Sequence, residues 1–336
     1  MLDFEPLVGL SIPGSSGRAG PVAKRARFET QRAVYERIAR NVGGHAQVMV
    51  KITSKGYNHG QAGAHASYIT RHGKLTAEDE LGFVLGDAAA VREKLDGWRL
   101  TRDTIFLDGT RRLRQTLHFT LGMPAGTDPS KVLEGARRFA QREFAGHQYV
   151  MVLHEPQSDP KPGAPAHPHV HLALRALSED GYRISVDKED LLYFRSAFAE
   201  QMRLLGVQAN ASRRIERGET KRSRSRALQE VIKRDKTAAK LWRARRLPDL
   251  SLPPGTSMNE ALRMAKDDYR LVVDQLSRSN READLQFARA ARHWVDQFPI
   301  VRATRELMDE RAQLLEQSLS QEAPSRRAKR NDERSR

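Results

Sequence analysis

The histidines are the residues of this sequence best suited to chemistry. Residues 167–171 read HPHVH, and twelve residues separate this run from His154. Residues two apart on a β-strand point to the same face, so His169 and His171 project together. Neutral imidazoles suit Mn, Zn, Ni or Co, and three of them leave positions open for substrate oxygens. The pattern predicts a metal site for phosphoryl chemistry; a merely polar strand face is the alternative.

Two β-like runs must position these histidines. Residues 147–154 and 167–174 are rich in β-formers and are joined by a Pro- and Gly-rich loop, which predicts a hairpin. The end of the first strand then lies beside the start of the second. His154 thereby comes within reach of His169 and His171.

Phosphoryl transfer by a covalent route also needs a nucleophile. Tyr68 lies in residues 67–74 (SYITRHGK) beside Arg71 and Lys74, cations that lower a phenol pKa and pair with phosphate. Small residues at helical spacing predict a short helix over residues 60–70 that carries Tyr68. Among the seven tyrosines, this local argument favours Tyr68 only modestly over ordinary amphipathic packing.

The remaining pattern predicts an α+β domain over about residues 46–210. Its central antiparallel sheet is flanked by helices, and a basic, helical C-terminal region follows. Further strands are expected at 47–53 and 115–123, and further helices at 129–144 and 188–205.

The composition of the chain excludes several kinds of site and function. The chain has 336 residues, a formal charge of +16 and no cysteine, which excludes disulfides, thiolate metal sites and a cysteine nucleophile. Residues 211–246 hold 14 Lys and Arg against four acids, and Trp242 offers a stacking surface there. Such charge indicates a nucleic-acid partner, with a solvated basic surface as the alternative. Without a long apolar run or a secretory start, we expect a cytoplasmic protein with no membrane insertion.

Five segments resemble, in the same order, those of conjugative relaxases of the MOB-P class, similar to the border endonuclease of T-DNA transfer. They are residues 47–53, 68–75, 123–128, His154 with 167–171, and 212–218. The resemblance covers roughly residues 46–220 and implies an HUH-type endonuclease fold with a five-stranded antiparallel sheet.

The resemblance implies roles for individual residues. Tyr68 would attack the scissile phosphate at an origin of transfer, nick one strand and keep its 5′ end as a phosphotyrosine. His154, His169 and His171 would bind a divalent cation, Mg or Mn. The strand would then be piloted during conjugative mobilization.

Other residues are expected to support this chemistry. His167 and His118 are candidates for a position behind the ligands. Glu155 and Asp159 are the candidate acids that orient a ligand or deprotonate Tyr68. The family places its acid in a short segment directly after the first histidine, whereas twelve residues intervene here, so neither acid maps cleanly.

Composition, charge and the resemblance together predict a division of the chain and a DNA contact set. The expected parts are a flexible basic N-terminal arm (1–45), the relaxase domain (46–215), a basic DNA-binding segment (216–250), a helical region (251–320) and a charged tail (321–336). The expected DNA-binding residues are Arg71, Lys74, Arg213, Arg214, Arg217, Lys221, Arg222 and Arg224.

The implied partners are single-stranded and duplex DNA at the origin, an accessory nick-region protein, a coupling ATPase and a type IV secretion system. The protein would be bacterial and cytoplasmic, with translocation to the recipient cell as an extension. Two alternatives stay open. A rolling-circle replication initiator of the HUH type would use a tyrosine after the histidines, namely Tyr193, and a non-catalytic origin-binding accessory protein would use none.

Overall fold

The computed structural model describes residues 31–107, 109–160, 165–186, 190–219 and 258–298, together with residue 313. The chain divides into two compact units, Met1–Ser212 and Arg213–Arg336, and each is described by itself. Residues 1–30 of the expected arm, most of the basic segment and the charged tail lie outside the described residues. Among the helices that are described, none has the length and apolar character needed to cross a membrane.

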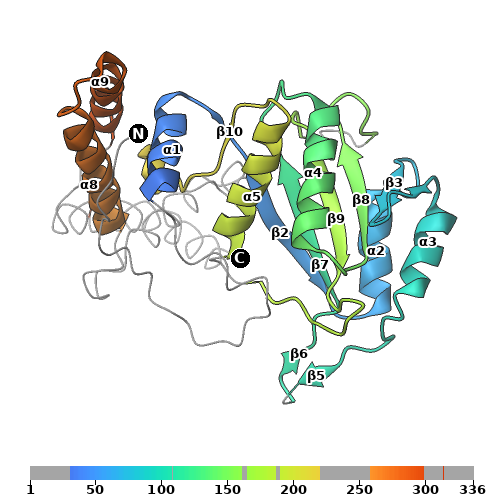
Figure 1. Cartoon of the computed structure of the whole chain (residues 1–336). Coiled ribbons are helices and arrows are strands. Elements are labelled where there is room, and N and C mark those ends of the chain that lie inside the picture. The colour runs from blue at the N-terminus through green and yellow to red at the C-terminus, as the bar shows by residue number, and fades with distance from the viewer. Residues whose placement is uncertain are drawn as a thin grey trace, which may run out of the picture. The chain divides into compact units, whose positions relative to one another are not determined.

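The first unit is built on a six-stranded sheet in the order β2-β7-β9-β8-β3-β4 (Figure 1). Every neighbouring pair in it is antiparallel. The strands are β2 (Met49–Gly56), β3 (Ala77–Asp79), β4 (Val84–Leu85), β7 (Thr116–Gly122), β8 (Tyr149–His154) and β9 (His169–Arg175). The predicted α+β fold with a central antiparallel sheet is confirmed.

Helices cover both faces of this sheet, and short strands complete the unit. The helices are α1 (Gln31–Val42), α2 (His59–Ile69), α3 (Ala88–Gly97), α4 (Pro129–Glu143) and α5 (Asp190–Leu204). The short strands are β1 (Ala46–Gln47), β5 (Phe106–Leu107), β6 (Arg111–Arg112) and β10 (Ala209–Asn210). Asp128 caps α4 by accepting from the Ser130 amide, as its place before Pro129 predicts.

The sheet has one strand more than the resemblance implies, because the chain reverses after β3. One carboxylate oxygen of Asp79 accepts hydrogen bonds from the amides of Leu81 (3.0 Å) and Phe83 (2.9 Å). This local turn folds the two residues of β4 back along β3. The sixth strand therefore depends on one side chain that satisfies two turn amides.

Apolar and polar side chains alternate along β7 and β9, so the two faces of the sheet differ in character. Leu117, Phe119 and Leu121 join the larger apolar cluster, together with Phe139 of α4 and Phe198 of α5. In Figure 1 these two helices lie on the near side of the sheet. Burial of this face provides the main hydrophobic stabilisation of the unit.

The opposite face carries a smaller apolar cluster and the polar side chains. His118 and Thr120 alternate with the core residues of β7 and share their face with His169 and His171 of β9. The apolar part of this face is covered by α2 and α3, through Ala66, Ile69, Val91 and Leu95 against Val150 and Val152. The part of this face that carries His169 and His171 is polar.

The described end of the expected N-terminal arm is folded. Residues 31–42 form α1, and the buried Asn41 accepts hydrogen bonds from the Asn210 amide nitrogen and the Ser212 hydroxyl, both at 2.8 Å. Ile38 is buried as well. The residues just before the sheet are therefore part of the first unit.

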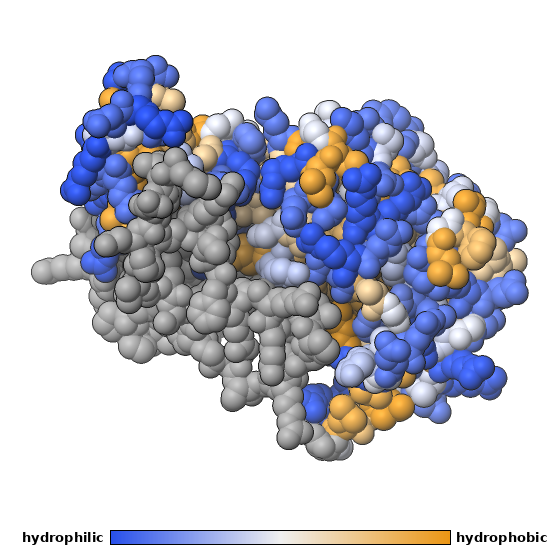
Figure 2. Space-filling model, viewed as in Figure 1, coloured by the Kyte–Doolittle hydropathy of each residue, from blue (hydrophilic) through white to orange (hydrophobic). Residues whose placement is uncertain are grey.

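Two hairpins carry exposed apolar side chains outside the two clusters. The larger of these side chains are Leu81, Phe83 and Val84 around β3 and β4, and Ile105 and Phe106 at β5. Figure 2 shows hydrophobic surface over both hairpins on an otherwise mainly hydrophilic face.

The second unit is helical where it is described, which confirms the predicted helical C-terminal region. It contains η1 (Ile215–Arg217), α8 (Met258–Leu276) and α9 (Glu282–Asp296). The hydroxyl of Tyr269 on α8 donates to the carbonyl of Glu216 at 2.7 Å, which ties η1 to the helix.

The buried His118 on the polar face makes stability depend on pH. His118 stacks on His65 with ring centroids 3.5 Å apart. Burial lowers the pKa of His118 to about 3, and the neighbouring His65 adds to the lowering. In the unfolded chain the pKa of this histidine is about 6.5. Below that pH the unfolded chain therefore binds more protons than the folded chain. Stability from this group is present above about pH 6.5 and is lost as the pH falls toward the folded pKa.

We therefore expect His118→Leu to flatten the pH dependence of unfolding. The wild type should lose up to about 2 kcal/mol through this group between pH ~7 and pH ~5, and the variant should not. Urea unfolding at several pH values measures this. Parallel curves for the two proteins would contradict the prediction.

Candidate metal centre and nucleophile

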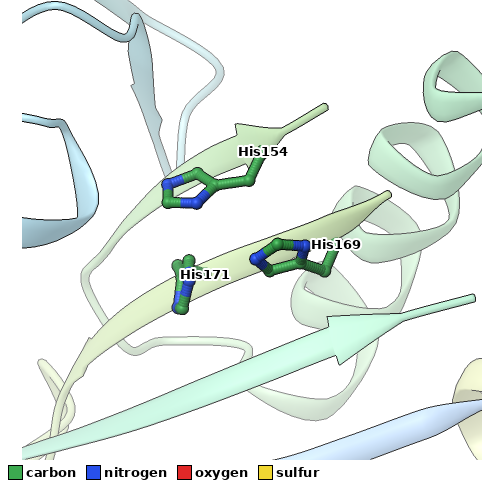
Figure 3. A group of neighbouring side chains, drawn as sticks. All are labelled: His154, His169 and His171. Carbon is green, nitrogen blue, oxygen red and sulfur yellow. The ribbon is translucent and has the colours of Figure 1, made fainter. Parts of the chain in front are cut away.

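Three imidazoles meet where β8 ends and β9 begins. The strand register places His154 directly opposite His169, and His171 follows two residues later on the same face. One nitrogen from each ring lies within 4.8 Å of the others. The ring centroids are 4.5–5.1 Å apart, and Figure 3 shows the rings gathered around one point. The predicted hairpin is confirmed, and it brings these three residues together.

Hydrogen bonds behind two of the rings set their orientation. Nδ1 of His169 donates to the carbonyl of His167 at 3.0 Å, because a carbonyl can only accept. Nδ1 of His171 shares a hydrogen bond of 3.2 Å with the Thr120 hydroxyl. The Nε2 atom of His169 therefore keeps its lone pair for a ligand, and His171 does the same when Nδ1 is the donor.

Burial favours the neutral form of the three rings. It lowers the pKa of His171 to about 2, and the neighbouring His154 and His169 add to this. It also lowers the pKa of His154 to about 4 and lowers the pKa of His169. A neutral imidazole is the form that binds a metal ion. The donor set of three imidazole nitrogens thus fits a divalent cation that keeps positions open for oxygen ligands.

The helix that carries Tyr68 is joined directly to this group. α2 begins after Asn58, whose side chain accepts from the Gln61 amide, and ends at Ile69. Carbonyls at a helix C-terminus lack partners within the helix. The carbonyl of Ile69 accepts from Nε2 of His154 at 2.6 Å. Tyr68, the preceding residue, is 48% exposed, so its ring is accessible to a large substrate.

An ion pair lies between Tyr68 and His154. Nε and Nη2 of Arg71 donate to the two carboxylate oxygens of Asp159 at 2.8 and 2.7 Å. Nη1 of Arg71 donates to the carbonyl of Tyr68 at 2.9 Å, and Nη2 donates to Nδ1 of His154 at 3.0 Å. The hydrogen bonds to Asp159 raise the pKa of Arg71 above its ordinary value.

The two candidate acids lie in different places. The carboxylate of Asp159 is 1% exposed, and its Oδ2 lies 3.2 Å from Nδ1 of His154. Glu155 instead accepts from the hydroxyl of Ser158 at 3.1 Å. Of the two, Asp159 is the acid that contacts the histidine group.

The chain turns sharply after α2 through three consecutive residues with positive φ. They are Arg71 (52°), His72 (60°) and Gly73 (83°). Such angles cost energy for residues with a Cβ and persist only when contacts hold them. The bond of Arg71 to Asp159 and a 2.9 Å bond between His72 and Ser67 supply those contacts. The turn therefore directs the Arg71 side chain back toward Tyr68 and His154.

Comparison with known proteins gives this site a context. Residues 68–206 match the family described as relaxase, MobA/VirD2-like, nuclease domain. This segment is a relaxase nuclease domain. It starts at Tyr68 and contains His154, His169 and His171.

The other comparisons add little. No curated protein matches the chain. One similar solved structure, described as the molecular basis of vancomycin resistance transfer in Staphylococcus aureus, is 12% identical with a TM-score of 0.28. The similarity covers 50% of this chain and 99% of that chain.

Other residues predicted for the site lie away from His154, His169 and His171. His118 bonds to the hydroxyls of Ser54 and Thr116, and His167 contributes its carbonyl to His169. Lys74 is exposed in the turn after α2. Tyr193, the residue that a replication initiator would use, packs against the larger apolar cluster on the opposite face of the sheet.

The other expected DNA-binding residues fall in two groups. Arg213, Arg214 and Arg217 are described in the second unit, where Arg217 pairs with Glu219 at 2.8 Å. Lys221, Arg222 and Arg224 lie outside the described residues.

Sequence reasoning missed three features of the site. Thr120, behind His171, lies two residues from His118 on β7. The alternation of that strand could therefore have predicted that both point to the same face. His65 lies one helical turn before Tyr68 on the same face of α2. The hydrogen bond from His154 to the Ile69 carbonyl could not be predicted from the sequence, because every residue type carries the same backbone acceptor.

The turn after Tyr68 should be sensitive to a single methyl group. A Cβ at Gly73 would lie 2.9 Å from the Ala88 amide nitrogen, whereas Gly82, with the same φ of 83°, has open space. We expect Gly82→Ala to cost about 1 kcal/mol from the positive φ alone. Gly73→Ala should cost about 1–3 kcal/mol more, because the neighbouring backbone must move.

Urea unfolding midpoints of the two variants measure the difference. Equal losses of stability would contradict the close contact with Ala88.

Proposed function

We propose that this chain is a DNA relaxase that nicks one strand at an origin of transfer through Tyr68, with a divalent cation held by the three histidines. One observation carries the proposal. The histidine group is bonded to the last turn of the helix that bears Tyr68, through the 2.6 Å contact between His154 and the Ile69 carbonyl. This contact lies in a domain of the relaxase nuclease family.

The proposed reaction exchanges one phosphodiester for another. The Tyr68 hydroxyl loses its proton as its oxygen attacks the phosphorus, the bond to the 3′ oxygen breaks, and that oxygen takes up a proton to leave as a 3′ hydroxyl. The products are a 5′-phosphotyrosine and a free 3′ end, so the reverse reaction rejoins the strand without ATP. A bound cation, Mg or Mn, would act as a Lewis acid on the phosphate oxygens.

Arg71 and Asp159 are the proposed positioning residues for Tyr68. The guanidinium holds the Tyr68 carbonyl and lies 5.1 Å from its ring centroid, and Asp159 holds the guanidinium. An adjacent positive charge favours the phenolate over the phenol. Asp159 is thus the acid proposed to support the nucleophile, by fixing Arg71 and by lying next to His154.

DNA at an origin of transfer is the proposed substrate, in single-stranded and duplex form. The charge of +16 and the cationic run over residues 211–246 support this through neutralisation of phosphates. Piloting of the strand, an accessory protein, a coupling ATPase, a type IV secretion system and translocation from a bacterial cytoplasm remain part of the same proposal.

A covalent-adduct assay tests Tyr68. The full chain is incubated with Mn²⁺ and a labelled oligonucleotide that covers the host element's candidate origin, and the adduct is mapped by mass spectrometry. We expect an adduct on Tyr68 that disappears on chelation and in Tyr68→Phe. Tyr193→Phe, a matched loss of one hydroxyl on the opposite face of the sheet, should retain it.

Other outcomes assign the chain to another class. An adduct on Tyr193 would make it a replication-type initiator. Binding of the origin without cleavage by the wild type would favour an accessory protein.

A matched pair of amide substitutions tests the supporting acid. Asp159→Asn should lower the rate of adduct formation by about ten- to a hundredfold, because it removes the charge that fixes Arg71 beside His154. Glu155→Gln should change the rate less than about threefold, since Glu155 contacts Ser158 and not the histidines.

Circular dichroism and thermal unfolding establish that both variants are folded. Wild-type rates for a folded Asp159→Asn variant would rule out this role for Asp159.

A further inference from the structure

His154 differs from the other two histidines because both of its ring nitrogens already have protein partners. Its Nε2 lies 2.6 Å from the Ile69 carbonyl, which can only accept, so Nε2 carries the proton. In the neutral ring the lone pair is then on Nδ1. Nη2 of Arg71 donates to this lone pair at 3.0 Å. Arg71 thus occupies the atom with which His154 would bind a cation, and Oδ2 of Asp159 lies 3.2 Å from the same atom.

The other two rings present a free nitrogen. His169 and His171 use Nδ1 for the His167 carbonyl and the Thr120 hydroxyl. Within the described residues, neither Nε2 atom meets a protein donor. A cation at this group therefore displaces a protein hydrogen bond at His154 alone.

The contact with Arg71 is the cheaper of the two to break. Turning the ring would leave the carbonyl of Ile69, a fully buried residue at the end of α2, without His154 as its donor. Nη2 of Arg71 has two hydrogens, and the second is on Asp159 Oδ2 at 2.7 Å. A cation bonded to Nδ1 would lie where Nη2 now is, so the guanidinium must swing aside to release Nδ1, and its Nε bond to Oδ1 of Asp159 keeps it attached while it does so.

We propose that Arg71 is a latch on His154. It occupies Nδ1 in the metal-free chain, releases it to the cation, and then offers the freed N–H to an oxygen of the scissile phosphate. A guanidinium matches phosphate geometry, and this one lies beside the Tyr68 ring. Metal binding and phosphate binding are thereby coupled through one side chain. The inference rests on the metal centre of the proposed function.

Nitrogen NMR of the wild-type chain tests the latch directly. Ring-labelled histidines are observed without metal and with Zn²⁺, a diamagnetic probe. We expect His154 to be protonated on Nε2 throughout and to coordinate Zn²⁺ through Nδ1. Coordination through Nε2, or by the other two histidines without His154, would overturn the latch. Absence of any coordination would instead refute the metal centre itself.

Mn²⁺ affinity provides a second measurement. Arg71→Lys keeps the charge but loses the fork that reaches both Asp159 and Nδ1, so Mn²⁺ should bind about tenfold more tightly than to the wild type. Lys74→Met removes a charge from the same turn and has no bond to His154. It should change the affinity by less than about threefold. Titration calorimetry of the full chains measures both, and equal affinities for Arg71→Lys and the wild type would overturn the proposal.

Discussion

The hydrogen bond between His154 and the carbonyl of Ile69 joins the histidine group to the helix that carries Tyr68. One partner belongs to the central sheet, which is rigid because both of its faces are packed. The other is the last carbonyl of α2, a group that the helix itself leaves unsatisfied. A carbonyl that every helix leaves unpaired at its C-terminus thus links the helix that carries Tyr68 to the histidine group.

Electrostatics at this link favour positive charge. The C-terminal end of α2 carries the negative end of the helix dipole, and the buried carboxylate of Asp159 adds a full negative charge. Arg71 neutralises both. Under the proposed function, a DNA phosphate would bind here only when cations outweigh this negative charge. The site therefore combines one buried acid with the positive groups that the proposed substrate needs.

Features that depend on local sequence patterns could be predicted from the sequence. Alternation in residues 167–171 and the adjoining strand ending at His154 sufficed to bring three rings together, because strand register is set by the residues themselves. The choice between Glu155 and Asp159 was beyond such rules, since it depends on how a loop folds back onto α2. Arg71 was expected on DNA, yet its main bonds are to Asp159, a partner far away in the sequence. The short strand β4 escaped prediction because two residues carry no periodic signal.

The register of β8 with β9 has a consequence for how this domain can vary. His154 and His169 are paired across adjacent strands, so their separation is set by the spacing of the sheet and not by the length of the connection between them. Residues can be inserted or deleted in that connection without moving either ring, provided that Asp159 keeps its contact. The connection is thus open to insertion and to engineering, while the spacing of the two histidines stays constant.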